Sequence, residues 1–347
     1  MPISNRLTSV LTRISADSKV TSDEATELVK AAAKVRYTEV EKTALQALLS
    51  GTSQFEPAAR TALQQFVDST PTRVDIADPR PLRGDDLLEW NSTVGASLFV
   101  DGVSYDDVVQ GVIGDCYLVS ALSALAAQEP KAITDAITDN HDGSYTVRFF
   151  EVVDDRGTTK PTTVVVADDF LGSQYQPQSY ARGRTPGEIW GPLLEKAYAQ
   201  WKGDYDAIGH GGLSAIVFTA ITGKSSAVFH LSDLPPDQQA ARLTGWLKAG
   251  HAITVGTRFS GLGGPDNQVV GNHAYTVLSV TDCDGTPTVR LRNPWGVRTD
   301  HNEKNKTGGE IELPMAEFMK LFEQGSVSGV TPTFWSDKVG FLQPTGR

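Results

Sequence analysis

Residues 110–118 read Gln-Gly-Val-Ile-Gly-Asp-Cys-Tyr-Leu, and this stretch decides the fold. Apolar residues follow Cys116 with the 3.6-residue period of a helix, which predicts a buried helix over about residues 116–127. The sulfur lies at the start of that helix, where backbone amides favour the thiolate, the nucleophilic form of cysteine. Position alone fits a buried structural cysteine equally well.

The partners of this cysteine come from a predicted hairpin. His273 begins one strand, Asn293 ends the next, and both lie equally far from Cys283 in the Asp-Cys-Asp-Gly turn at residues 282–285. An antiparallel hairpin would set the two side chains side by side, where asparagine can orient imidazole. An isolated histidine is usually an ordinary strand residue, but its occurrence with Cys116 and Asn293 favours a catalytic role. The order Cys, His, Asn is that of papain-like proteases.

Four blocks of the chain resemble the calpain family of cysteine proteases, in the family's order, over about residues 80–325. They are residues 110–118, Glu-Ile-Trp-Gly-Pro-Leu-Leu-Glu-Lys-Ala-Tyr-Ala at 188–199, Asn-His-Ala-Tyr at 272–275 and Arg-Asn-Pro-Trp-Gly at 292–296. Two positions depart from the family's pattern. Tyr117 stands where calpains commonly have tryptophan, and Asn272 stands where glycine commonly precedes the histidine.

The resemblance implies a role for each matching residue. Cys116 would be the nucleophile, His273 the base and acid, and Asn293 the residue that orients the imidazole. Gln110 would join the backbone N–H of Cys116 in the oxyanion hole, where losing one donor costs roughly 10²–10³ in rate. Trp295 would shield the contact between asparagine and histidine.

The resemblance also implies one calcium site in the first half of the protease core. Its ligands would be the carboxylates of Asp107 and Glu188 and the backbone oxygens of Val100 and Gly102. Oxygen ligands of this kind suit calcium. No cofactor is needed for the chemistry itself.

A second calcium site, in the other half of the core, is matched poorly. Asp300, Glu303 and Glu310 could supply oxygens, but a solvated run of charges fits these residues better. We therefore expect the calcium dependence to be partial or absent.

The expected fold class is α+β: a two-lobed papain-like core, helical around Cys116 and β-rich around His273 and Asn293, preceded by a small α-helical domain. Residues 1–70 predict about four short helices, two of which follow capping boxes (Thr21 with Glu24, Thr38 with Glu41). The predicted boundaries are a helical domain at 1–70, a linker at 71–86, the first lobe at 87–211 and the second at 212–347.

Composition limits the partners. Against 42 Asp and Glu the 347 residues contain 31 Lys and Arg, a net charge of −11, which disfavours nucleic acid and anionic membrane. Two cysteines cannot build a disulfide scaffold, and no apolar run is long enough to span a membrane. Without the apolar core of a secretory signal, the default expectation is a cytoplasmic protein with protein or peptide substrates; export without a cleaved signal and the oligomeric state stay open.

Three functions fit these residues. The first is a calpain-like cysteine endopeptidase that forms a thioester acyl-enzyme. The second is a cysteine acyltransferase of the transglutaminase kind, although such enzymes usually complete the triad with aspartate rather than asparagine. The third is a catalytically silent calpain-like binding module. For residues 1–70, a pro-segment released by self-cleavage between about Ser69 and Asp86 and a permanent docking module or brace are equal alternatives.

Overall fold

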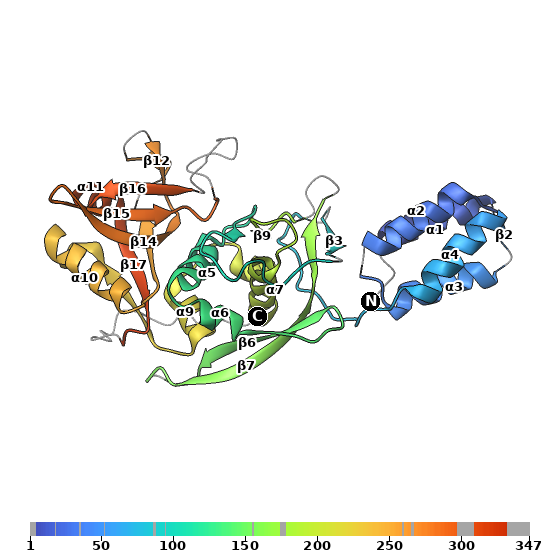
Figure 1. Ribbon diagram of the computed structural model, residues 1–347, viewed down its shortest axis with the longest axis horizontal. Helices are drawn as coiled ribbons and strands as arrows, with labels where there is room; N and C mark the ends of the chain where they lie inside the picture. The colour runs from blue at the N-terminus through green and yellow to red at the C-terminus, as the bar shows by residue number, and fades with distance from the viewer. Residues whose placement is uncertain are drawn as a thin grey trace.

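The computed structural model describes residues 5–17, 19–34, 36–51, 53–85, 88–93, 95–154, 156–173, 178–258, 260–264, 267–296 and 309–331. The structure is mixed α/β, and its buried apolar residues form three clusters. Figure 1 shows the N-terminal helices at one end, a helix-rich group in the middle and a larger sheet at the other end. Within the described ranges, none of the helices has both the length and the apolar character to span a bilayer.

Four short helices form the N-terminal group. They are α1 (Asn5–Asp17), α2 (Ser22–Lys34), α3 (Glu39–Ser50) and α4 (Pro57–Ser69), with strand β1 (Lys19–Val20) paired in parallel with β2 (Gln54–Phe55). Their apolar sides meet around Leu28, Leu45 and Leu63, which are fully buried. The capping box before α3 is confirmed, because Thr38 accepts from the N–H of Val40 and Glu41 accepts from the N–H of Thr38.

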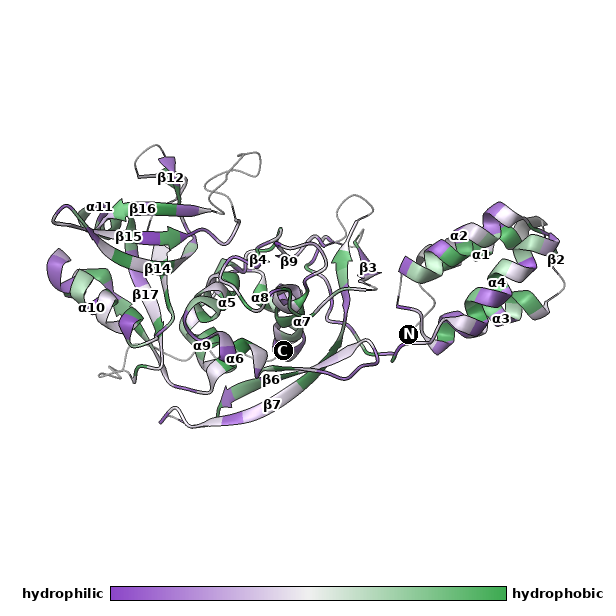
Figure 2. Cartoon of the chain, in the orientation of Figure 1, coloured by the Kyte–Doolittle hydropathy of each residue, from purple (hydrophilic) through white to green (hydrophobic). Residues whose placement is uncertain are grey.

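The middle group is packed around helices α5 (Cys116–Gln128), α7 (Trp190–Lys202) and α9 (Ser214–Thr222). Figure 2 shows hydrophobic residues along α5 and α9, as expected for helices buried on most of their surface. Beside them lies an antiparallel sheet of β5 (Ile137–Asp139), β6 (Ser144–Val152) and β7 (Thr159–Ala167). The shorter elements are β3 (Glu89–Ser92) paired with β8 (Asp169–Gly172), β4 (Val108–Val109) paired with β9 (Arg182–Gly183), α6 (Pro130–Thr134) and α8 (Tyr205–Ile208).

The third group is a six-stranded antiparallel sheet in the order β10-β17-β11-β14-β15-β16. Its strands are β10 (Ser226–His230), β11 (Ile253–Thr257), β14 (Ala274–Cys283), β15 (Thr286–Arg292), β16 (Glu310–Pro314) and β17 (Phe322–Ser328). Helices α10 (Pro236–Lys248) and α11 (Met315–Leu321) pack with it around Tyr275 and Phe318. The turn η1 (Leu231–Asp233) and the short pair β12 (Leu262–Gly263) and β13 (Val269–Val270) complete the group.

The β14–β15 hairpin corrects the predicted register. Thr276 pairs with Arg292, so His273 and Asn293 are not direct partners in the ladder. Asp284 and Gly285 both have positive φ and form the two-residue turn, which moves the centre of the hairpin beyond the position assumed from the sequence. His273 and Asn293 lie just outside the paired strands, at the same end of the hairpin.

Candidate active site

Cys116 is the first residue of α5 and remains partly exposed. Burial raises the pKa of its thiol, and a hydrogen bond with the backbone of Ala274 offsets only part of this rise. Burial therefore opposes the thiolate expected at this helix end, because loss of solvent disfavours the charged form of the sulfur. The contact with Ala274 sets the sulfur beside the residue that follows His273.

The side chains of His273 and Asn293 are joined directly. Nε2 of the imidazole lies 2.9 Å from Oδ1 of Asn293, and the same oxygen accepts the backbone N–H of Trp295 at 3.0 Å. Because Oδ1 acts as an acceptor for both, Nε2 must carry the proton, which leaves Nδ1 of His273 as the free acceptor. The Trp295 ring packs against the imidazole of His273, with the two ring centroids 4.6 Å apart.

Burial favours the neutral form of both the thiol and the imidazole. Burial lowers the pKa of His273 to about 4, and the hydrogen bond to Asn293 opposes that decrease only in part. Both His273 and Cys116 belong to the described residues, and there the imidazole bonds Asn293 rather than the sulfur.

Helix α5 and strand β14 are held together by two reciprocal hydrogen bonds. Oγ of Ser120 donates to the carbonyl of Ala274 at 3.0 Å, and Oγ1 of Thr276 donates to the carbonyl of Ser120 at 2.8 Å. Ser120 and Thr276 are fully buried. These bonds hold the N-terminal part of α5, which begins at Cys116, against the start of β14, which directly follows His273.

Gln110 lies between the cysteine block and the asparagine block. Its backbone N–H donates to the carbonyl of Pro294 at 2.9 Å, and its side-chain amide donates to the carbonyl of Ile113 at 2.7 Å. The side chain is buried, and its oxygen has no hydrogen-bond partner among the described residues. The same side chain also contacts the carboxylate of Asp115, the residue directly before Cys116.

Arg292 is a residue whose role the sequence reasoning missed. Its guanidinium is fully buried and donates to the carbonyls of Val108 and Asp106 and to Oγ of Ser123. Burial lowers its pKa to about 10, so it stays protonated at neutral pH. The available signal was its position directly before Asn293: an arginine at the end of a buried strand needs partners from another element.

The four residues expected to bind calcium lie near one another. Oε1 of Glu188 accepts the N–H of Val100 at 2.8 Å, and Oδ2 of Asp107 accepts the N–H of Ser104 at 2.6 Å. Burial raises the pKa of Glu188, and the negative charge of Asp107 raises it further. Oε2 of Glu188 is buried without a partner in the described structure, so the site offers an oxygen that a cation would satisfy. Gly102, in the same loop, has a φ of 98°.

The residues considered for a second calcium site give a different result. Glu310 is already engaged, because it accepts hydrogen bonds from Nε of Arg290 at 2.8 Å and from the hydroxyl of Tyr105 at 2.6 Å. Asp300 and Glu303 lie outside the described residues. Within the described part of the chain, no group of three or more His, Cys, Asp and Glu side chains is arranged to hold a metal.

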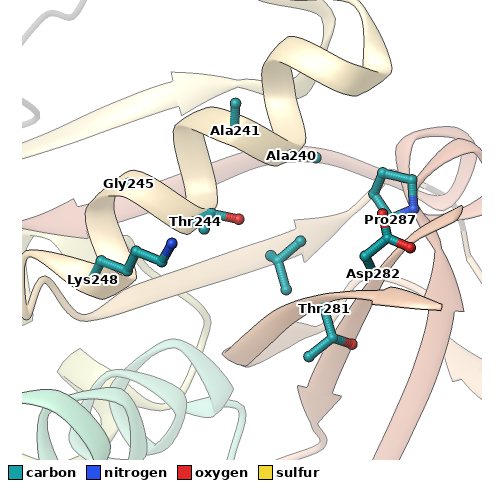
Figure 3. A pocket seen from close by; sticks show the side chains of 9 residues that line it. Ala240, Ala241, Thr244, Gly245, Lys248, Thr281, Asp282 and Pro287 are labelled. Carbon is teal, nitrogen blue, oxygen red and sulfur yellow. The ribbon is translucent and has the colours of Figure 1, made fainter. Parts of the chain in front are cut away.

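Two cavities differ in their relation to this site. The larger, of about 440 Å³, lies between α10 and the β14–β15 hairpin, and Figure 3 shows Thr244 and Lys248 on one side and Asp282 on the other. It contains none of the predicted catalytic residues. A smaller cavity of about 50 Å³ is lined by Tyr117 and Ala274, the neighbours of the cysteine and the histidine.

Comparison with known proteins gives a consistent result. Residues 55–308 match the family described as calpain family cysteine protease. The calpain-type cysteine protease DEK1 of Arabidopsis thaliana is 30% identical over 263 residues, which cover 72% of this chain and 12% of that protein. Calpain-8 of Mus musculus is 27% identical over 267 residues, covering 67% of this chain and 37% of that protein. The chain thus spans only a minor part of the length of these relatives.

Proposed function

The chain belongs to the calpain family of cysteine proteases, and we propose that it is an endopeptidase whose catalytic residues are Cys116, His273 and Asn293. The observation that carries the proposal is the bond between Nε2 of His273 and Oδ1 of Asn293, beside the helix that begins at Cys116. This bond occupies Nε2 and leaves Nδ1 of His273 to act as the base. The proposed fold is the two-lobed papain-like arrangement, with the α5 group as one lobe and the six-stranded sheet as the other.

The proposed reaction is acyl transfer to the sulfur of Cys116. Nδ1 of His273 takes the thiol proton while the sulfur attacks the scissile carbonyl. The backbone N–H of Cys116 and the side-chain amide of Gln110 stabilise the oxyanion, and the imidazolium then protonates the leaving amine. Water, deprotonated by His273, hydrolyses the thioester and regenerates the thiol.

Asn293 contributes orientation. Because its oxygen accepts both from His273 and from the N–H of Trp295, rotation of the imidazole would break the first of these bonds. Trp295 covers the bond and reduces competition from water, which strengthens it. The arrangement supports a histidine that keeps the tautomer with the proton on Nε2 and uses Nδ1 as the base in every turnover.

Casein, offered with and without a primary amine, tests the proposal. The wild type should release peptides with new free termini whether or not the amine is present, and Cys116→Ser should release none. Incorporation of the amine without cleavage would identify the acyltransferase alternative. Tight binding of casein with neither product would identify the binding module.

We further propose that Asp107 and Glu188, with the backbone oxygens of Val100 and Gly102, bind one calcium ion. The unpartnered Oε2 of Glu188 supports this, and the bound charge would stabilise the two carboxylates. Calorimetric titration should give one calcium site in the wild type and a much weaker one in Asp107→Asn. Chelator should reduce cleavage of casein only in part; complete loss, restored steeply by calcium, would contradict dependence on a single site.

A further inference from the structure

Asp115, the residue before the candidate nucleophile, is the N-cap of α5 but makes no side-chain capping bond. An aspartate in this position ordinarily accepts a backbone N–H from the first turn of the helix. Here the side chain is fully buried, and neither carboxylate oxygen receives a well-formed hydrogen bond from the described N–H and O–H groups. The polar side chains that face it are Glu195 of α7 and Gln110.

Glu195 is the second member of this contact. It is 1% exposed, and its Oε1 accepts the N–H of Ala181 at 2.9 Å. The next residue, Lys196, does not serve the pair, because its ammonium group bonds Asp78 and Asp169. The other titratable groups near the pair are Cys116, Tyr117, Tyr180 and Tyr205, whose pKa values are raised by burial and further by the charge of Asp115 or Glu195; none of them brings a positive charge.

Two buried carboxyl groups in contact without a cation cannot both be ionised at moderate cost. Burial raises the pKa of Asp115 to about 7, and burial with the charge of Asp115 raises that of Glu195 well above its ordinary value. One proton held between the two carboxyl groups would meet the hydrogen-bonding need of both. It leaves a single negative charge and gives each side chain a hydrogen bond.

We propose that Asp115 and Glu195 form a positioning pair that shares one proton and keeps the Asp115 carboxylate turned away from the N-terminus of α5. The inference rests on the proposed protease function of Cys116. A carboxylate that capped α5 would occupy a backbone N–H and place negative charge where the oxyanion develops. Turned inward, it leaves those amides to the oxyanion and lies against Gln110, the second oxyanion donor.

The substitutions Glu195→Gln and Glu195→Ala distinguish the effect of the hydrogen bond to Asp115 from the effect of the titrating proton and of the side chain's volume. A glutamine can accept from the N–H of Ala181 and donate to Asp115, so it preserves both bonds without a titrating proton. We expect Glu195→Gln to keep kcat within about threefold, and Glu195→Ala to lower kcat by about 30-fold with little change in KM. Glu312→Gln, on an exposed position of β16, is the matched control.

The pH profile gives a readout that a merely structural role would not move. At alkaline pH the wild-type pair loses its shared proton, the two carboxylates repel, and kcat should fall. In Glu195→Gln this limb should move to higher pH or vanish. Equal losses of kcat in both variants, with the wild-type pH profile retained, would overturn the proposal.

Infrared spectroscopy tests the shared proton without relying on activity. Wild type should show the carbonyl stretch of a buried protonated carboxyl group that Glu195→Gln lacks, and this comparison stands even if Glu195→Ala does not fold. Absence of the band in wild type would overturn the pair, whether or not casein is cleaved. A folded wild type that has the band but does not cleave casein would contradict the proposed function and leave the pair supported.

Discussion

At the scale of single residues, the site depends on which atoms already have partners. Oδ1 of Asn293 accepts from both His273 and the N–H of Trp295, which determines the tautomer of the imidazole. The amide of Gln110 donates to the carbonyl of Ile113 and also contacts the carboxylate of Asp115. Hydrogen bonds made before the substrate binds do not have to be organised during the reaction.

Replacing Gln110 by alanine should impair the chemical step. An oxyanion donor acts mainly in the transition state, so kcat should fall by roughly 10²–10³ while KM changes little. Steady-state cleavage of a fluorogenic peptide measures both constants. Gln64→Ala, on the exposed face of α4, should behave as wild type. A change confined to KM would remove Gln110 from the oxyanion hole.

The buried imidazole of His273 should make folding sensitive to acid. Its pKa is about 4 in the folded chain against an ordinary value of 6.5, so the unfolded chain binds more protons between these values. The stability contributed by the neutral ring is present above pH 6.5 and is lost as the pH falls towards 4. Between pH 7 and pH 5, wild type should lose about 2 kcal/mol more unfolding free energy than His273→Ala.

Urea denaturation at the two pH values measures this difference. His230→Ala, which removes an exposed histidine at the end of β10, is the control and should lose as much stability as wild type. Equal losses in wild type and His273→Ala would show that the imidazole of His273 titrates normally in the folded chain.

At the scale of elements, the contact between α5 and β14 aligns the candidate nucleophile and base. The two bonds between Ser120 and the 274–276 segment are buried and join residues far apart in sequence. Arg292 adds a third connection, from the end of β15 to the carbonyls of Asp106 and Val108. These connections belong to regular elements, so the geometry of the site depends on rigid parts of the fold.

Thr276→Val should separate this contribution from packing, because valine keeps the shape and removes the hydroxyl. We expect unfolding free energy to fall by about 1–3 kcal/mol, since the carbonyl of Ser120 loses its side-chain donor, and kcat to fall as well. Thr281→Val, at the exposed end of the same strand, should change neither. Unaltered stability and kcat in Thr276→Val would show that the bond does not align the site.

Part of this architecture could be predicted from local patterns. The period after Cys116 predicted α5, and the capping box of Thr38 with Glu41 predicted the start of α3, because each pattern is local to one element. The predicted register of the β14–β15 hairpin was wrong, because the true register depends on the turn at Asp284 and Gly285 and on a bulge in the ladder.

Long-range polar contacts could not be derived from the sequence. The pairing of Asp115 with Glu195 and the partners of Arg292 arise only when separate elements pack together. The burial that raises the pKa of the Cys116 thiol was missed for the same reason. Helix position predicts a low pKa, whereas the extent of desolvation depends on the tertiary structure.

At the scale of the whole molecule, a buried ionic cluster ties the N-terminal helices to the α5 group. The guanidinium of Arg36 bonds Asp169 at 2.7 Å and Asp78 at 2.6 Å, and Lys196 bonds the same two carboxylates. Burial alone would raise the pKa of Asp169, but Lys196 and Arg36 bring it below its ordinary value. Arg73 reaches the neighbouring Asp168 in a further ion pair.

Arg36→Met should therefore destabilise the chain. Removing one partner from a buried ion pair typically costs about 3–5 kcal/mol, because the remaining charge stays buried. Arg13→Met removes an exposed pair with Glu27 and should destabilise the chain much less, because solvent screens that pair. Thermal unfolding of the full chain compares them. Equal effects would show that the Arg36 cluster does not secure the N-terminal helices.

Self-cleavage between Ser69 and Asp86 stays a prediction, and the cluster bears on it because Asp78 lies inside this segment. Incubation of wild type beside Cys116→Ala, followed by sequencing of new N-termini, checks it. If residues 1–70 are an inhibitory pro-segment, a product that starts in this window should form only with wild type and be more active. An unchanged activity after deletion of residues 1–70 would exclude an inhibitory role.

Labelling with a peptidyl epoxide, followed by peptide mapping, tests most directly whether Cys116 and His273 act together as nucleophile and base. We expect one adduct, on Cys116 of the wild type, and almost none in His273→Ala, although this variant retains the thiol. The exposed Cys283 serves as an internal control and should stay unmodified. Equal labelling of Cys116 and Cys283, or labelling of Cys116 that is undiminished in His273→Ala, would contradict the account.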